Sequence, residues 1–157
     1  MDLKTCTVLV SPTSFRQGDP KVQELLESSV GKVVYNTTGK HLSAVQLKEM
    51  LHGVDGYIAG VDEVSAEALT GADRLKVIAR YGVGFDTIDL AAAKSRGIVV
   101  TNTPGANSVS VAELALGLAL DLARGITAAV DATRAGGWPR SSGISLKGKT
   151  FGIVGLG

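Results

Sequence analysis

Short apolar runs alternate along the chain with segments of helical periodicity. Strands buried in a parallel sheet form nearly continuous β-branched runs, whereas the helices between them repeat every 3.6 residues. The pattern therefore predicts right-handed β-α-β units and a parallel sheet covered on both faces, which is an α/β fold. The predicted strands are Thr7–Val10, Lys32–Tyr35, Gly56–Ala59, Val77–Arg80 and Ile98–Thr101, and the predicted helices are Pro20–Ser29, Ser43–Leu51, Ser65–Leu69 and Thr87–Ser95.

The segment Ser108–Gly136 breaks this alternation, because its helical pattern continues without an intervening strand. Ser110 and Glu113 have the spacing of a capping box, with Asn107 as an alternative cap. Residues 109–123 are apolar almost all round but contain two acidic side chains, so burial between protein layers is favoured over a membrane span. We predict one long helix over this segment.

Residues 150–157 read as an apolar strand that leads into Gly155-Leu156-Gly157. A Gly-x-Gly-x-x-Gly turn after a strand binds the pyrophosphate of a dinucleotide, because glycines allow a close backbone approach and the following helix has a positive end. Gly155 and Gly157 form the first half of that fingerprint. We therefore expect the N-terminal part of a longer enzyme, and we expect these 157 residues alone to be inactive.

Charge and cysteine content narrow the class of function. The chain has 16 Lys and Arg residues against 15 Asp and Glu, a net charge of +1. A small-molecule partner is therefore favoured over nucleic acid or a membrane surface. The single cysteine, Cys6, excludes an intramolecular disulfide and suits a reducing cytoplasm. Because the strand pattern begins within a few residues of Met1, we expect no signal peptide and a cytoplasmic protein.

Residues 80–86, which follow the fourth predicted strand, are a candidate anion site. Without Cβ atoms at Gly82 and Gly84, the backbone can direct its N–H groups toward one point, which suits a carboxylate. The alternative is an ordinary turn in which Asp86 caps the next helix. The loop 101–108 is a second candidate, since its amides and hydroxyls could orient a substrate carbonyl, although such residues also form turns and caps.

Three other chemistries fit the sequence poorly. A receiver-type phosphorylation site needs acidic residues after the first strand and at the end of the third, where Ser11-Pro12 and Ala59-Gly60 stand instead. His41 and His52 have no carboxylate or cysteine at ligand spacing, so we expect surface histidines and no metal site. Cys6 has no histidine nearby and is expected to be a packed thiol.

Three stretches taken in order, residues 75–86, 97–104 and 110–113, resemble the D-2-hydroxyacid dehydrogenase family, and its D-3-phosphoglycerate dehydrogenase-like branch in particular. The likeness runs over residues 50–157. It implies a flavodoxin-like substrate domain over residues 1–102. It also implies that residues 103–157 contain an interdomain helix and the first strand of a truncated NAD-binding Rossmann domain.

The resemblance further implies roles for individual residues. The amides of Val83 and Gly84 would hold the substrate carboxylate, and Asn107 would orient the substrate carbonyl. Val111 would contact the nicotinamide of NAD or NADP in the complete protein, and no cofactor is expected on the isolated chain. The family's catalytic arginine, acidic residue and histidine have no counterpart in this chain. The implied cofactor-binding residues are Val83, Val111, Gly155 and Gly157, and no catalytic residue is assigned.

The substrate and the assembly remain open at this level. Relatives that oxidise phosphoglycerate carry an arginine just after the third strand, where this chain has Ala59-Gly60. Arg80 could substitute for it as a substrate-binding residue, so 3-phosphoglycerate stands beside unphosphorylated acids such as glyoxylate and hydroxypyruvate. The alternative is a non-enzymatic cofactor-sensing protein on the same scaffold. Exposure of the apolar helix would favour a homodimer or self-association through residues 108–136.

Overall fold

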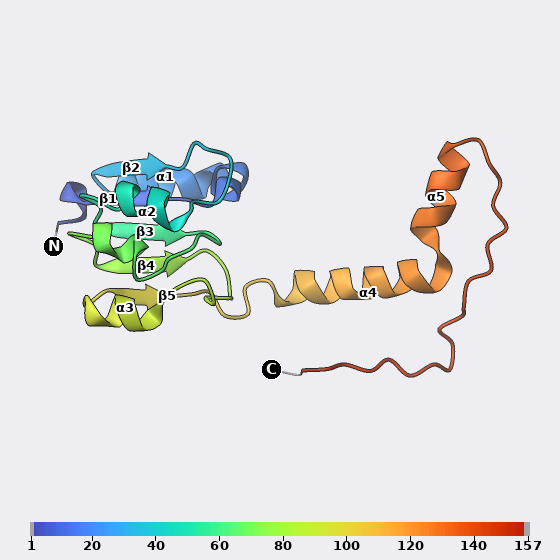
Figure 1. Cartoon of the computed structure of the whole chain (residues 1–157). Helices are drawn as coiled ribbons and strands as arrows, with labels where there is room; N and C mark the ends of the chain where they lie inside the picture. Colours follow the sequence, from blue (N-terminus) through green and yellow to red (C-terminus); the bar gives the residue numbers. More distant parts are fainter. Residues whose placement is uncertain (1, 156–157) are drawn as a thin grey trace. The chain divides into compact units, whose positions relative to one another are not determined.

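The computed structural model describes residues 2–155, and the chain divides between Ala106 and Asn107 into two compact units. The first unit is built on a five-stranded, all-parallel sheet of order β2-β1-β3-β4-β5 (Figure 1). This order is the one found in flavodoxin-like sheets, and it confirms the predicted α/β class. The strands are β1 (Thr7–Val10), β2 (Lys32–Tyr35), β3 (Gly56–Ala59), β4 (Val77–Arg80) and β5 (Val99–Thr101).

The helices of the first unit follow the predicted order with shifted ends. They are α1 (Pro20–Ser29), α2 (Ala44–Met50) and α3 (Leu90–Ser95), with 3-10 turns η1 (Leu3–Thr5), η2 (Thr13–Gln17) and η3 (Ala68–Gly71). The α-helix predicted over residues 65–69 is therefore wrong, since a single 3-10 segment takes its place. The alternative in which Asp86 caps the next helix is also wrong, because Asp89 and not Asp86 accepts a hydrogen bond from the Ala92 amide, at 2.9 Å.

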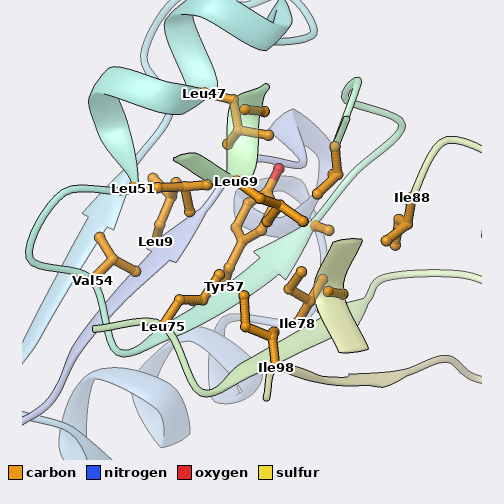
Figure 2. Close-up of a cluster of buried hydrophobic side chains, with 14 of the residues drawn as sticks. Leu9, Leu47, Leu51, Val54, Tyr57, Leu69, Leu75, Ile78, Ile88 and Ile98 are labelled. Carbon is orange, nitrogen blue, oxygen red and sulfur yellow. The ribbon is translucent and has the colours of Figure 1, made fainter. Parts of the chain in front are cut away.

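The main core lies on the sheet face that α2, η3 and α3 cover. One row of paired residues crosses all five strands in the order Val34, Leu9, Tyr57, Ile78 and Val100. Every member of this row belongs to the core or packs against it, and Figure 2 shows Tyr57 in the middle of the cluster. Because successive side chains alternate between the faces of a sheet, this row fixes which residues face the opposite side.

The opposite face is covered only in part. The connection from β1 to β2 runs toward one edge of the sheet, and the connections from β2 onward run toward the other edge. Because crossovers between parallel strands are right-handed, α1 lies on this face and the later helices lie on the opposite one. At the far end of this face, Val77 and Val99 are 37 % and 59 % exposed. The first unit therefore has one fully packed layer and one half-open layer.

The second unit contains two helices where one was predicted. α4 (Ser108–Arg124) and α5 (Ile126–Arg134) are separated by Gly125, whose φ of 60° is a left-handed conformation that ends a helix. Asp121 stabilises the break, because its carboxylate accepts hydrogen bonds from the Thr127 amide at 2.7 Å and the Thr127 hydroxyl at 2.8 Å. The single helix predicted over residues 108–136 is thus wrong at Gly125.

Two further expectations for this unit are corrected. The capping box at residues 110 and 113 does not form, since the N-cap of α4 is Asn107, three residues before Ser110. Asn107 is the alternative cap predicted above, but it makes no side-chain cap bond. The strand predicted over residues 150–154 is absent, because no other described strand offers it the ladder of hydrogen bonds that a strand requires. Within residues 2–155, no helix combines the length and apolar character needed to cross a membrane.

The buried Asp55 carboxylate and the half-exposed Arg74 side chain form an ion pair at the amino end of the sheet. The Asp55 carboxylate, 7 % exposed, accepts hydrogen bonds from the Arg74 Nε and Nη2 atoms, each at 3.1 Å. It also accepts one from the Thr7 amide at 2.9 Å. Because these residues precede or begin β1, β3 and β4, the carboxylate holds the entries of three adjacent strands.

We predict that Arg74→Ala destabilises the fold, because it leaves the Asp55 carboxylate buried with a single amide partner. The expected loss is about 2 to 3 kcal/mol in the free energy of unfolding, measured by urea denaturation. The control is His52→Ala, which removes an exposed pair whose Nδ1 and Oδ2 atoms are 2.9 Å apart. The His52→Ala variant should have the same urea midpoint of unfolding as the native protein. Equal effects of the two substitutions would contradict the importance of burial.

Candidate functional site

The turn after β4 is held in a conformation that depends on glycine. Gly82 has a φ of 144°, and a Cβ atom built on it would lie 2.9 Å from the Arg80 Nη1 atom. The Gly82 carbonyl accepts a hydrogen bond from the Thr103 amide at 3.1 Å. The predicted turn therefore forms, and the segment after β5 braces it.

Asn102 fixes the next peptide group of the turn. Its Nδ2 atom donates to the Val83 carbonyl at 2.8 Å. The Val83 carbonyl and the Gly84 amide belong to one planar trans peptide, in which C=O and N–H point in opposite directions. Holding the carbonyl toward Asn102 therefore directs the Gly84 N–H away from Asn102.

The amides of the turn are free to bind a ligand. Among the hydrogen bonds of residues 2–155, none has the Val83 or Gly84 amide as its donor. Gly84 is exposed at the surface of the unit. Successive free amides in a glycine turn form a concave site for an anion, which the backbone can offer without any charged side chain.

Arg80 lies beside this turn at the end of β4. Its Nη1 atom donates to the Tyr81 carbonyl at 2.5 Å, and its buried Nε atom has no hydrogen-bond partner among the described residues. Asp86, which does not cap α3, lies close by, since a Cβ atom on Gly84 would be 3.5 Å from its Oδ2 atom. The turn thus has one cation and one carboxylate beside its free amides.

A small cleft adjoins the turn. It has a volume of about 170 Å³. It is lined by Phe85 and Leu90, which follow β4 in the sequence, and by residues 100–102 at the end of β5. Its apolar wall and the Asn102 amide give it the mixed character of a small-ligand pocket. Asn102 belongs to the candidate loop 101–108, but the sequence alone assigned it no individual role. The signal available was its place directly after β5, next to the end of β4.

A second group of side chains meets at the ends of β1 and β3. The sequence pattern did not predict this group. The Asp62 carboxylate, 1 % exposed, accepts hydrogen bonds from the Tyr57 hydroxyl at 2.8 Å and from the Gly60 amide at 3.2 Å. Its other oxygen accepts one from the Leu42 amide at 2.6 Å, and the Ser11 hydroxyl also donates to Asp62. Both carboxylate oxygens of Asp62 therefore have hydrogen-bond partners, as a buried polar group requires.

The remaining residues singled out in the sequence lie elsewhere. Asn107 and Val111 belong to the second unit, where Asn107 is exposed and Val111 is 54 % exposed. Gly155 has a φ of 87° outside any strand, and Gly157 lies outside the described residues. Arg80, Val83 and Gly84 are therefore the predicted residues that the structure brings together in one turn.

No metal centre is evident in the described part of the chain. Across residues 2–155, no three His, Cys, Asp or Glu side chains gather as a metal site requires. His41 is exposed, and His52 lies at the surface beside Asp73. The free thiol of Cys6 is buried next to β1.

Comparison with known proteins places this arrangement in a family. The sequence pattern of the catalytic domain of D-isomer specific 2-hydroxyacid dehydrogenases matches residues 8–150. A Thermotoga maritima protein named hydroxypyruvate reductase is 39% identical over 142 residues, which cover 88% of this chain and 46% of the relative. A Methanocaldococcus jannaschii protein named D-3-phosphoglycerate dehydrogenase is 48% identical over 97 residues, covering 60% of this chain and 18% of the relative.

A solved structure agrees with these relatives. The NADPH-dependent glyoxylate/hydroxypyruvate reductase of Sinorhizobium meliloti, in complex with NADP and malonate, superposes with a TM-score of 0.75 at 30% identity. The match covers 97% of this chain and 46% of that protein. The chain thus spans about half the length of these proteins, or less. On the extent of the matched residues, it belongs to the D-isomer specific 2-hydroxyacid dehydrogenase family.

Proposed function

We propose that the complete protein transfers a hydride between NAD(H) or NADP(H) and a small 2-hydroxy or 2-oxo acid, and that the turn after β4 binds the carboxylate of that acid. The observation that carries this proposal is the Asn102 hydrogen bond to the Val83 carbonyl, which orients the free Gly84 amide. A fixed pair of amides recognises a carboxylate without the entropy loss of ordering a long side chain.

Arg80 supports the same assignment electrostatically. Its guanidinium lies next to Gly82, and its buried Nε atom lacks a partner among the described residues. A cation beside two free amides increases the affinity for an anion and orients it. In this mechanism the turn binds and orients the acid, and the group that moves the proton is supplied from outside these 157 residues.

The second unit is proposed to contribute to the cofactor domain. The relative from Sinorhizobium meliloti holds NADP, which supports a nicotinamide dinucleotide here. Residues 150–155 contain no strand, and of the two fingerprint glycines only Gly155 lies among the described residues. The roles of Asn107 toward the carbonyl and Val111 toward the nicotinamide therefore stay predictions, as does the inactivity of the isolated chain.

The first test of the proposal is Gly84→Val in the complete native protein. A Cβ atom at Gly84 has no contact closer than 3.5 Å, so the variant is expected to fold. Its side chain should obstruct the amides and raise the KM for a 2-oxo acid by about tenfold or more. Gly18→Val is the control, because a Cβ atom there would have no contact closer than 3.8 Å and the residue lies outside the turn. An unchanged KM in the Gly84 variant would remove the carboxylate from this turn.

Asn102 is predicted to act as a positioning residue. Asn102→Ala leaves the Val83 carbonyl without its side-chain donor, so the Gly84 amide loses its fixed direction. We expect the KM for the 2-oxo acid to rise by about three- to tenfold with a smaller change in kcat, because the ground-state anchor is weakened. Steady-state kinetics with a saturating dinucleotide measures both constants. A fall in kcat at constant KM would assign Asn102 another role.

We also propose that the 157-residue chain self-associates through α4, with a second copy as the partner. Seven apolar residues of α4 are each at least 49% exposed: Val109, Val111, Leu114, Leu116, Leu118, Leu120 and Leu122. An exposed apolar helix of this length normally meets a partner, and a net charge of +1 gives little repulsion between copies.

Sedimentation velocity of the chain should therefore show a species larger than the monomer, and Leu118→Glu should shift it toward the monomer. Leu25→Glu on α1 is a matched control, because Leu25 is 67% exposed and Leu118 is 53% exposed. The control should leave the sedimentation profile unchanged. A monodisperse monomer at high concentration would refute the association.

A further inference from the structure

Two aromatic side chains join the turn after β4 to the loop after β1. The Phe15 and Tyr81 rings meet edge to face, with their centroids 5.8 Å apart and their planes at 68°. Phe15 lies in η2 and is 7% exposed, although it is not a member of the cluster that fills the main core. Tyr81 is 46% exposed and directly precedes Gly82. Because an edge-to-face pair has a preferred geometry, Phe15 favours one position of the Tyr81 ring.

Tyr81 is the first residue after β4 and continues the alternation of that strand. Its amide donates to the Ala59 carbonyl at 2.9 Å, which extends the β3–β4 ladder by one bond. Ile78 faces the main core, so Tyr81, three positions later, faces the other side of the sheet. Among residues 2–155, no hydrogen bond involves the Tyr81 hydroxyl. Packing therefore orients this side chain, and Phe15 is its aromatic partner.

The backbone of the turn is held separately at its entry, its middle and its exit. The segment after β5 holds the middle through the Gly82 and Val83 carbonyls, as described above. The exit is held by the Val64 amide, which donates to the Thr87 carbonyl at 2.9 Å. At the entry, the Tyr81 carbonyl accepts a hydrogen bond from the Arg80 side chain. The entry is thus the part of the turn that also depends on a ring contact.

We propose that Phe15 is a positioning residue for the acid, because its ring holds Tyr81 and thereby the entry of the turn whose amides bind the carboxylate. This inference rests on the proposed function and extends the site to the loop after β1. Hydrogen bonds weaken as the donor turns away from the acceptor, so a small shift of the turn reduces the affinity for the acid. Phe15 acts in this way without touching the acid.

The test is a double-mutant cycle with Phe15→Leu and Tyr81→Leu in the complete native protein. Leucine keeps an apolar side chain at each position but removes the ring. With hydroxypyruvate or glyoxylate and a saturating dinucleotide, each single variant should raise the KM for the acid by about three- to tenfold, with a smaller change in kcat. The double variant should raise it no further than the larger single effect, since both substitutions remove the same contact.

Two further variants separate positioning from stability. Arg74→Ala, which acts at the amino end of the sheet, should lower the urea midpoint but keep the native KM. Tyr81→Phe keeps the ring and should have a lower KM than Tyr81→Leu. A lower urea midpoint with a native KM in Phe15→Leu would overturn the inference, and so would additive effects on KM in the double variant. Should Phe15→Leu fail to fold, equal KM values for Tyr81→Leu and Tyr81→Phe would overturn it.

Gly84→Val distinguishes this inference from the proposed function. A raised KM in Gly84→Val together with a native KM in both leucine variants would overturn the role of Phe15 and leave the carboxylate in the turn. A native KM in all three variants would overturn both proposals.

Discussion

The Tyr57 side chain is the point at which the core and the carboxyl edge of the sheet depend on each other. Its ring is the middle member of the apolar row that crosses all five strands, and its hydroxyl donates to the Asp62 carboxylate at 2.8 Å. A buried tyrosine supplies apolar area through its ring and requires a hydrogen-bond partner for its hydroxyl. The packing of the core therefore sets the position of Asp62, and through it the Ser11 and Gly60 segments.

The same edge is connected sideways to the glycine turn. The Tyr81 amide donates to the Ala59 carbonyl at 2.9 Å, and the Phe15 and Tyr81 rings meet edge to face with centroids 5.8 Å apart. Asn102 then joins the end of β5 to the turn. Parallel strands bring their carboxyl ends to one side of a sheet, so loops that are distant in sequence become neighbours there. Rigidity at this edge comes from contacts between loops, not from any single loop.

The sequence predicted the strands well because each is a short run rich in apolar residues between helical segments, and four of the five have the predicted bounds. The prediction failed where hydrogen bonds between side chains and other parts of the chain determine the local structure. An isolated glycine is tolerated inside many helices, so Gly125 by itself does not predict a helix end. The hydrogen bonds from Thr127 to Asp121 show that the helix ends there. Asp62 was missed because its bond to Ser11 spans 51 positions, a separation that no local pattern reports. The glycine spacing indicated the turn 80–86 and the family resemblance named Val83 and Gly84 within it, whereas the role of Asn102 required the geometry of two adjacent strand ends.

Family membership and substrate choice rest on different parts of this structure. Relatives named hydroxypyruvate reductase and D-3-phosphoglycerate dehydrogenase match the chain at 39% and 48% identity, so overall similarity does not choose between their ligands. The sheet and its core do not distinguish one small acid from another, because their side chains are apolar and buried. The polar groups that meet at the carboxyl edge are the part of the first unit that a ligand can contact. They include the free amides of the turn after β4 and the Asn102 side chain that orients them. At the end of β3 the buried Asp62 side chain fills the space, since a Cβ atom on Gly60 would lie 3.1 Å from its Oδ2 atom.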